Sequence, residues 1–448
     1  ALGGDFRGYA GLPGGLAVVR APSGRPDPTW RPSLGIAGTV RLLARQPDGR
    51  LLLGGEFSTV NGWFSPRVAR LWPSGEVDTT FQAPAEGLGT GELLALTLDA
   101  GGQVLLGGRF QTVGGQPRSG LARLGPDGQL DAGFQPMLNT GPAAPEVRAI
   151  AVQPDGKILA GGTILLPNGS NPPRSHVVRL LDAGSLDAGF TAALPPGGRV
   201  EALLLLPGGE LVVGGGFYNN RQELIYRLRA DGSPDPSFQT VLADPVIGGT
   251  VRALLPASGG GLWAAGAFVR ANTLGTSNVA RLRADGSTDA SFVSALPLPL
   301  SNPANIGMVN ALALEPGGQV LAGGALGNQS TRQGPYLRRL LPTGALDTNY
   351  LGSIPPGPDD EVLALLAQPD GNILVGGRFR QLAGRAQPTL ARLLATGPTS
   401  SRGKADSAPA LSVWPNPTEV GTLHLGFDAQ AQPRRVQLLD AQGRIVLT

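Results

Sequence analysis

The sequence predicts an all-β protein, a β-propeller built from four-stranded antiparallel blades. Three features of the chain predict it. A unit of about fifty residues recurs, its apolar runs are short and β-rich, and turns rich in Pro, Asp and Gly separate them. A single four-stranded meander cannot bury both of its faces, whereas similar units packed around a ring can do so.

The first half of a unit predicts a tight hairpin. In the unit that begins at Val147, the apolar run 147–152 is followed by Gln-Pro-Asp-Gly and by a second run, 157–162, which ends in a Gly-Gly pair. Pro154 presets φ at the first turn position, and Gly156 takes the left-handed position without a steric penalty. We therefore expect a three-residue loop with a glycine bulge between two antiparallel strands.

The second half of a unit predicts another hairpin. The stretch 70–78 is symmetric about Ser74, so that Arg70 faces Asp78 and Leu71 faces Val77. The same eight-residue offset recurs at Arg123/Asp131, Arg179/Asp187, Arg227/Asp235, Arg281/Asp289 and Arg339/Asp347. A cross-strand ion pair contributes about 0.2–1 kcal/mol. So many copies indicate a structural clamp, because a catalytic pair would not need them.

The units follow one another along most of the chain. Residues 1–34 contain the end of strand 2 and strands 3 and 4 of a first unit, and the last unit begins at Val362 without a clear fourth strand. Six complete units lie between them and begin near Val40, Leu93, Val147, Val200, Val251 and Val309. We expect eight blades, with seven as the alternative. The chain starts inside a repeat, so we expect it to be a fragment of a longer protein.

Composition changes after the last unit. We assign the propeller to residues 1–394. Residues 395–410 are small and polar and predict a flexible linker. Residues 411–448 return to a β pattern with a hairpin turn near Gly443, and predict a small, partial β-sandwich-like module.

Composition also limits the chemistry. The 36 Lys and Arg nearly balance the 33 Asp and Glu, and the arginines are spread through every unit, so we expect no nucleic-acid partner. With no cysteine and only two histidines, His176 and His424, we expect no catalytic triad, metal site or cofactor. No apolar run approaches the roughly 18 residues of a membrane-spanning helix.

Loop lengths predict where a ligand binds. The turns between strands 1 and 2 and between strands 3 and 4 are short and alike, whereas the other connections are long and differ between units. These two sets emerge on opposite faces of an antiparallel blade, so one face is uniform and the other is variable. Variable loops on a rigid scaffold usually carry binding residues. The candidates on the variable face are Trp63, Phe64, Tyr218, Asn219, Asn220, Arg221 and Arg270.

Two classes of function stay open. The leading hypothesis is a secreted or cell-surface, non-enzymatic propeller that binds a glycan or a protein, or acts in adhesion. The alternative is a polysaccharide hydrolase or lyase that uses acids such as Glu92, Asp359, Asp360 and Glu361, although no spacing selects a pair. Two axial carboxylates about 5–10 Å apart would favour the enzyme. An axis lined by apolar strand 1 residues would favour the binding module.

The repeated motifs resemble a known family. Gln-Pro-Asp-Gly-Lys-Ile-Leu-x-Gly-Gly and Arg-Leu-x-x-x-Gly-x-x-Asp-x-x-Phe are similar to the delta-60 repeats of bacterial β-propellers, over residues 1–394. Ile164 and Leu326, which replace the Phe found after other Gly-Gly pairs, depart from the pattern, as does the turn 258–260. The resemblance implies a fold and no activity.

The tail resembles a type A C-terminal sorting domain of the type IX secretion system. Leu-Ser-Val-Trp-Pro-Asn-Pro at 411–417, with Pro415, Asn416 and Pro417, is similar to its opening, and the stretch 436–444 with Gly443 to its middle. The resemblance implies export by the type IX machinery across the outer membrane of a Bacteroidota-type cell. It also implies an extracellular or outer-surface location for the propeller.

Overall fold

The structure is a computed structural model. It describes residues 36–84, 87–89, 91–136, 138, 145–165, 174–195, 198–217, 224–240, 242–243, 249–271, 274–296, 307–327, 335–348, 350, 357–382, 385–386 and 389–393, together with 411–414, 424–427, 438–439 and 445–447. The chain divides into two compact units, Ala1–Thr396 and Gly397–Thr448. No helix in the described residues is long and apolar enough to span a membrane.

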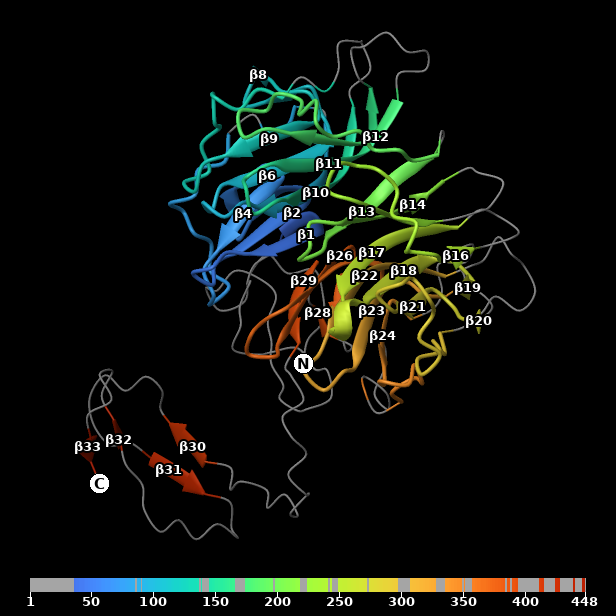
Figure 1. Cartoon of the computed structure of the whole chain (residues 1–448). Coiled ribbons are helices and arrows are strands. Elements are labelled where there is room, and N and C mark those ends of the chain that lie inside the picture. The colour runs from blue at the N-terminus through green and yellow to red at the C-terminus, as the bar shows by residue number, and fades with distance from the viewer. Residues whose placement is uncertain are drawn as a thin grey trace. The chain divides into compact units, whose positions relative to one another are not determined.

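The first unit is all-β. Its described part contains one short 3-10 turn, η1 (Ser258–Gly260), and no α-helix. Seven antiparallel sheets follow one another in the chain, each with three principal strands in sequence order (Figure 1). These strands are β1 (Ile36–Arg45), β2 (Leu51–Val60) and β4 (Val68–Leu71); β5 (Glu92–Leu98), β6 (Val104–Arg109) and β9 (Leu121–Leu124); β10 (Glu146–Val152), β11 (Ile158–Leu165) and β12 (Arg174–Leu180); β13 (Arg199–Leu205), β14 (Leu211–Gly216) and β15 (Ile225–Leu228); β17 (Thr250–Pro256), β18 (Leu262–Ala267) and β21 (Val279–Leu282); β22 (Met308–Leu314), β23 (Val320–Ala325) and β24 (Leu337–Leu340); β25 (Val362–Ala367), β26 (Ile373–Gly377) and β29 (Leu390–Leu393).

Shorter strands either extend the first sheet or form small sheets of their own. They are β3 (Trp63–Phe64), β7 (Thr112–Val113), β8 (Gln116–Pro117), β16 (Leu242–Ala243), β19 (Arg270–Ala271), β20 (Leu274–Gly275), β27 (Gln381–Leu382) and β28 (Arg385–Ala386). The predicted fourth strand is reduced to a single bridge in six sheets, such as Leu71 with Val77. The predicted all-β propeller of antiparallel sheets is therefore confirmed, with outer strands shorter than expected.

The predicted turn between the first and second strands is also confirmed. Two backbone hydrogen bonds close this loop. The Gly156 N–H donates to the Gln153 carbonyl (2.9 Å), and the Gln153 N–H donates to the Lys157 carbonyl (2.8 Å). Gly156 has a φ of 84°. This left-handed position is the one that the Gln-Pro-Asp-Gly sequence requires.

The Gly-Gly pairs set the spacing between sheets. A Cβ placed on the first glycine would lie within 3 Å of an apolar side chain on the first strand of the next sheet: Gly54 against Leu93, Gly107 against Val147, Gly161 against Val200, Gly214 against Val251 and Gly323 against Val362. The second glycine lets the backbone approach a carbonyl of its own first strand, as Gly108 does with Glu92. Both glycines are thus explained by close packing.

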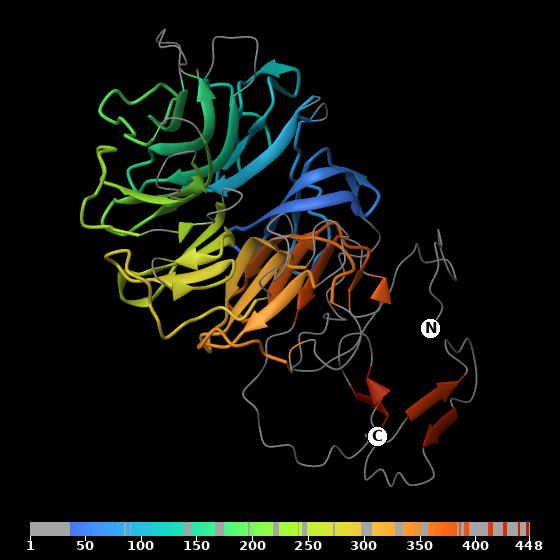
Figure 2. The same cartoon turned by 90° about the vertical axis from the view of Figure 1, so that its right-hand side faces the viewer.

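The same contact closes the ring. A Cβ on Gly376 of β26 would lie 2.7 Å from Val40 Cγ1 of β1, so the last sheet packs on the first through the same contact that joins the five pairs above. Leu374 and Leu390 pack in one core cluster with Ile36 and Val40. Figure 2 shows the blue first sheet beside the orange-red last sheet.

This packing bears on the predicted blade count. We expected eight blades, the eighth completed by residues 1–34, which lie outside the described residues. In the described part of the chain the sheet 362–393 packs directly on the sheet that begins at β1, through the Gly376 and Val40 contact. The described sheets thus form a ring of seven, and the choice between eight and seven blades stays a prediction.

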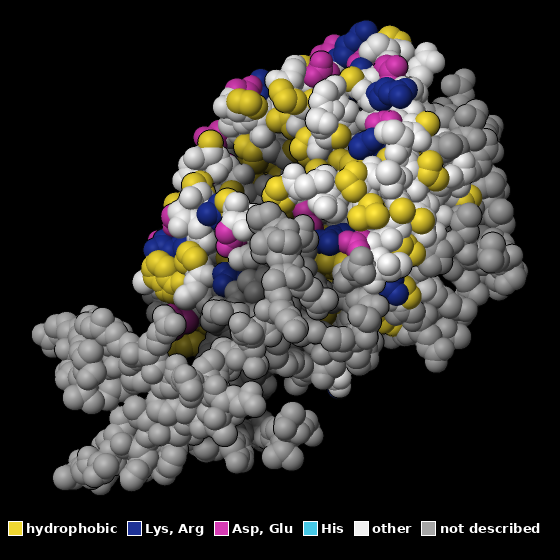
Figure 3. Space-filling model, turned by 90° about the horizontal axis from the view of Figure 1, so that it is seen from below, with side chains coloured by type: hydrophobic (Ala, Val, Ile, Leu, Met, Phe, Trp, Pro, Cys, Tyr) yellow, Lys and Arg dark blue, Asp and Glu magenta, His cyan; other side chains and the backbone are white. Residues whose placement is uncertain are grey.

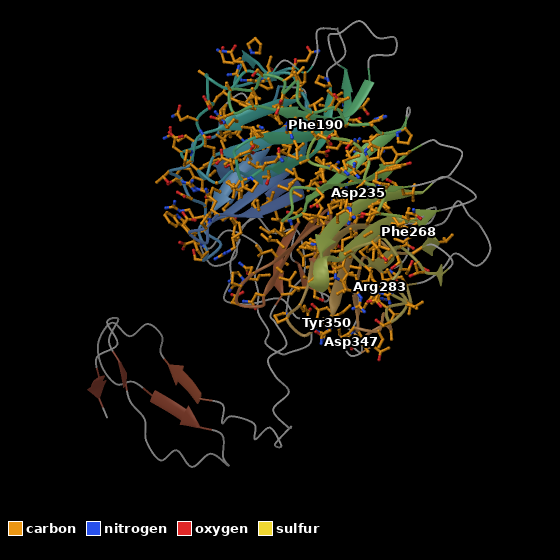
Figure 4. The ribbon with its side chains drawn as sticks, viewed as in Figure 1. Phe190, Asp235, Phe268, Arg283, Asp347 and Tyr350 are labelled. Carbon is orange, nitrogen blue, oxygen red and sulfur yellow. The ribbon has the colours of Figure 1, made fainter. Side chains whose placement is uncertain are left out.

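The six Arg–Asp pairs predicted from the eight-residue offset are all present. Their N–O distances are 2.7 Å for Arg70–Asp78, 2.8 Å for Arg123–Asp131, 2.9 Å for Arg179–Asp187, 2.7 Å for Arg227–Asp235, 2.8 Å for Arg281–Asp289 and 2.6 Å for Arg339–Asp347. Each guanidinium also lies over the aromatic ring that ends its unit, as Arg70 does over Phe81 at 4.8 Å. In the sixth sheet Arg339 joins Asp347 and Tyr350, which lie side by side in Figure 4.

These groups also connect neighbouring sheets. The Gln82 N–H, which follows Phe81, donates to the Asp127 carbonyl in the next sheet's outer turn (2.7 Å), and Arg70 Nη1 donates to the adjacent Pro126 carbonyl. Arg179 makes the equivalent bond to the Ala230 carbonyl (2.6 Å). We call each Arg, its Asp and its closing aromatic a latch. Latches hold the uniform face of the ring together.

The second unit contains two short hairpins. β30 (Leu411–Trp414) pairs with β31 (His424–Phe427), and β32 (Leu438–Leu439) pairs with β33 (Ile445–Leu447), all antiparallel. The predicted sorting-motif residues Pro415, Asn416, Pro417 and Gly443 lie outside the described residues, as does the linker 395–410.

Candidate functional site: bulged residues around the propeller axis

A β-bulge recurs at one position in every sheet. The register between the first and second strands shifts by one residue near the start of the first strand, for example between Val147 and Ala149. The extra residues are Arg41, Leu94, Arg148, Glu201, Arg252, Asn310 and Leu363. Each is partly buried, and each follows a residue that is at most 1% exposed. Bulges commonly redirect a side chain next to a functional site.

We call these seven residues the axial ring. The first strands of neighbouring sheets contact one another all the way around the propeller, so they form its innermost layer. The bulged residues stand near the end of each first strand at which the long connections enter. The axial ring therefore lies at the mouth of the axis on the variable face.

Polar contacts link the third sheet to the fourth, and the fifth sheet through the sixth to the seventh. Arg148 Nη1 lies 3.1 Å from Glu201 Oε2, and its Nη2 lies 2.5 Å from Glu146 Oε1. Arg252 Nη1 donates to Asn310 Oδ1 at 3.0 Å. Asn310 Nδ2 then donates to Glu361 Oε1 at 2.9 Å. The axis is thus not lined by apolar side chains alone.

The charges in this network stabilise one another. Burial opposes the positive charge of Arg148, but the carboxylates of Glu201 and Glu146 outweigh it and raise the pKa of Arg148. Arg199 Nε lies 2.6 Å from the other oxygen of Glu201. Both carboxylate oxygens of Glu201 are therefore engaged by guanidinium groups.

The four acids considered for hydrolysis all have structural partners. Glu92 pairs with Arg109 at 2.8 Å, and Glu361 accepts from Asn310 and lies 3.4 Å from Arg378. Asp359 Oδ1 accepts the backbone N–H groups of residues 380 and 381, and Asp360 Oδ1 accepts the N–H of residue 361. The contacts of Asp359 and Asp360 hold the backbone around the seventh sheet.

The predicted aromatic candidates Trp63 and Phe64 form the tip of a hairpin. Asn61 and Gly62 both have positive φ, 51° and 80°, which makes a tight type I′ turn. Trp63 is 57% exposed and Phe64 is 65% exposed. The second sheet has an equivalent hairpin with Gln116 and Pro117 at these positions.

The described residues do not test whether the other predicted binding residues lie together. Tyr218, Asn219, Asn220 and Arg221 lie outside the described residues. Arg270 is placed in β19, where it pairs with Ala243 and Gly275, and only its backbone is described. Whether these five residues join Trp63 and Phe64 in one site stays a prediction.

A shallow hollow lies on the opposite, uniform face. It has a volume of about 500 Å³ and is lined by the irregular turn at η1 and by the Arg281–Asp289 latch, including Arg283 and Asp285. Its charged groups are already paired, with Arg281 Nε 2.8 Å from Asp289. It reflects the departure of this turn from the Gln-Pro-Asp-Gly pattern.

Other candidate chemistry has a structural explanation. His176 is buried and meets Phe217 edge to face at 5.9 Å between ring centroids. Among the described residues, no group of three or more His, Cys, Asp or Glu side chains is placed to hold a metal ion. On the described surface in Figure 3, basic and acidic side chains alternate and form no continuous patch of one sign.

Sequence reasoning missed the axial ring. The signal was present, because each unit reads apolar residue, variable residue, small or apolar residue at the start of its first strand, as in Val-Arg-Ala and Val-Glu-Ala. In a regular strand, successive side chains point alternately to the two faces of the sheet, so the variable residue would pack between this blade and its neighbour. Only the bulge turns it toward the axis.

The repeats match a known protein family. The model of the domain of unknown function DUF5122, a β-propeller, matches residues 46–81, 102–134, 153–190, 207–238, 262–292, 316–350 and 368–397, more than half of the chain. The chain belongs to this family. Each of the seven matched segments falls on one of the seven sheets. The match confirms repeated β-propeller units, whereas the resemblance to delta-60 repeats and to a sorting domain stays a prediction.

Solved structures are similar in fold. The extracellular domain of BT4673, described as a one-component system of B. thetaiotaomicron, is 12% identical with a TM-score of 0.46, over 80% of this chain and 38% of that chain. Virginiamycin B lyase from Staphylococcus aureus is 12% identical with a TM-score of 0.47, over 85% and 98%. PorZ, a surface component of the type-IX secretion system of Porphyromonas gingivalis, is 15% identical with a TM-score of 0.38, over 88% and 51%.

At these identities and TM-scores the likeness carries no information on activity. This chain also spans only 38% of the first of those structures. No curated protein matches the sequence.

Proposed function

We propose that this chain is an extracellular, non-enzymatic binding module that takes a glycan or protein ligand on its variable face. One observation carries the proposal. In the axial ring, different side chains, among them Arg148, Glu201 and Asn310, occupy the equivalent backbone position of every sheet. The uniform face instead repeats the same latch. Side chains that vary at equivalent positions of a rigid, repeated backbone are typical of recognition sites.

The ion pairs in the axial ring favour binding over hydrolysis. A glycosidase needs one carboxyl group that is protonated and can donate its proton. Glu146 and Glu201 are both engaged in ion pairs with Arg148, at 2.5 Å and 3.1 Å, so neither stands free to donate a proton to a substrate. We therefore expect the intact chain to bind polysaccharide or protein without cleaving it.

A screen tests this function. The intact chain is applied to a glycan array and, as bait, to a panel of extracellular proteins, and each hit is incubated with the chain and examined for cleavage products. We expect retention of at least one ligand and no new reducing ends or peptides. Steady release of products that is lost in Glu146→Gln and Glu201→Gln would instead identify an enzyme.

We propose further that the tail directs export by the type IX secretion machinery. The support is the Leu-Ser-Val-Trp-Pro-Asn-Pro sequence at 411–417 together with the hairpins that follow it. A reporter fused to the segment from Leu411 to the native C-terminus should reach the surface or medium of a cell that has this machinery. Retention of the reporter inside that cell would contradict the proposal.

A further inference from the structure

Arg252 differs from the other arginines around the axis. It is partly buried on β17, and among the described residues it makes one side-chain hydrogen bond, from Nη1 to Asn310 Oδ1 at 3.0 Å, and no ion pair. Its Nε is buried and has no hydrogen-bond partner there. A guanidinium group has five N–H donors, so the described residues use only a small part of its bonding capacity.

Five arginines near the bulges form ion pairs with glutamates. Their N–O distances are 2.6 Å for Arg41–Glu56, 2.8 Å for Arg109–Glu92, 2.5 Å for Arg148–Glu146, 2.6 Å for Arg199–Glu201 and 3.4 Å for Arg378–Glu361. Arg252 differs from these five, because among the described residues its one side-chain partner is the uncharged amide of Asn310.

Removal of Arg252 from water has an electrostatic cost. Burial lowers the pKa of Arg252, and the attraction of Glu201 offsets this only in part because Arg148 opposes it. Asn310 accepts from Arg252 through Oδ1 but cannot neutralise the charge, because its amide is uncharged. An anion beside Arg252 would relieve this cost.

We propose that Arg252 binds the carboxylate group of an acidic saccharide at the mouth of the axis. This inference rests on the proposed binding function and names its ligand class. One guanidinium without an ion pair among the described residues suits a singly charged group. The planar guanidinium fork matches a planar carboxylate in two parallel hydrogen bonds.

The exposed aromatic hairpin favours a saccharide over an acidic peptide as the source of the carboxylate. Trp63 and Phe64 stand on the same face as the axial ring, because β2 continues past the bulge opposite Gly54 and Gly55 to the hairpin tip. Phe64 pairs with Thr59, four residues beyond Gly55 and therefore roughly 13 Å farther along the strand. Large exposed rings offer the flat apolar surfaces on which sugar rings stack.

The experiment compares oligogalacturonate with its methyl ester, which has the same sugar skeleton without charge, by calorimetric titration of the intact chain at fixed salt. We expect the ester to bind roughly ten- to a hundredfold more weakly, the change expected for loss of a charge-assisted pair. Arg252→Gln should weaken binding of the acid by a similar factor and leave the ester unaffected, and Arg252→Lys should lie between. Arg283→Gln, an exposed arginine on the uniform face, is the matched control and should change neither.

A second pair of variants tests the aromatic contribution. Trp63→Ala should weaken binding of acid and ester by the same factor, and Gln116→Ala in the equivalent hairpin should weaken neither. The melting temperature of every variant is measured. If Arg252→Gln does not fold, the comparison of acid and ester on the wild-type chain still decides the question.

The outcomes separate this inference from the proposed function. Equal binding of acid and ester would overturn the carboxylate site while saccharide binding stands. Binding of a polyglutamate peptide but of neither saccharide would overturn it in favour of a protein ligand. If none of the three binds, the inference is overturned, and the ligand screen decides the broader function independently.

Discussion

The two faces of this propeller use the same repeated backbone in opposite ways. On the uniform face, six sheets repeat one latch, with Arg, Asp and a closing aromatic ring in the same geometry each time. On the variable face, all seven sheets share one β-bulge but present basic, acidic, amide and aliphatic side chains from it. We interpret the repeated side chains as contacts that assemble the ring, and the repeated backbone with varied side chains as a surface for recognition.

The largest expected effect comes from breaking a buried latch. The Asp78 and Arg70 side chains are 0% and 5% exposed. Asp78→Ala leaves Arg70 charged and buried, so we expect the free energy of unfolding to fall by about 3–5 kcal/mol. Asp289→Ala removes the partly exposed equivalent, where Arg281 is 25% exposed, and should cost about 0.2–1 kcal/mol. Urea denaturation measures both, and equal losses would contradict this gradient.

The next effect concerns closure of the ring. A Cβ on Gly376 would lie 2.7 Å from Val40 Cγ1, so Gly376→Ala forces the first and last sheets apart and should destabilise the chain by about 1–3 kcal/mol. Gly275→Ala is the control, because nothing lies within 4 Å of a Cβ there. Thermal unfolding of the two variants makes the test, and an unchanged melting temperature for Gly376→Ala would speak against direct packing of β26 on β1.

The smallest expected effect, counted for each titratable group, is the loss of stability in acid that arises from the latch aspartates. Burial acts to raise the pKa of Asp78, but hydrogen bonds from Thr80 and Arg70 outweigh it and hold that pKa below its usual 3.8; Asp131 is likewise lowered, by Arg123 and the Gly133 N–H. A lowered folded-state pKa means that the unfolded chain binds more protons in acid. The stability from these groups is therefore present above pH 3.8 and lost as the pH falls through the folded pKa.

Unfolding titrations between neutral pH and pH 2 measure this loss. Asp131→Asn should reduce the acid-dependent part of the loss, because its amide does not titrate. Asp48→Asn, a substitution at an exposed turn residue, serves as a control. If stability rose on acidification, the assigned direction of these pKa shifts would be wrong.

Much of the fold could be predicted from the sequence because its reasons are local. The Gln-Pro-Asp-Gly turn depends on the φ preferences of Pro154 and Gly156, and the Arg70–Asp78 pair follows from the symmetry of a short hairpin. The exposed hairpin with Trp63 and Phe64 was also identified as a candidate, since connection length marks the variable face. Each of these features involves residues close together in the chain.

The remaining features required the tertiary structure. Alternation along a strand did not reveal the bulge at Arg148, because an extra residue is recognised only against its partner strand. Nor could closure of the described sheets in a ring be predicted, since it depends on whether the last sheet packs on the first through Gly376 and Val40.

By itself, the sequence determined that this chain forms repeated antiparallel β-sheets with Arg–Asp clamps, because turn chemistry and cross-strand pairing act over a few residues. The tertiary structure alone decided that the seven described sheets close in a ring and that Arg252 forms no ion pair with the described residues around the axis. Ring closure and ion pairing around the axis both depend on residues that are far apart in the chain. Only the folded arrangement brings those residues together.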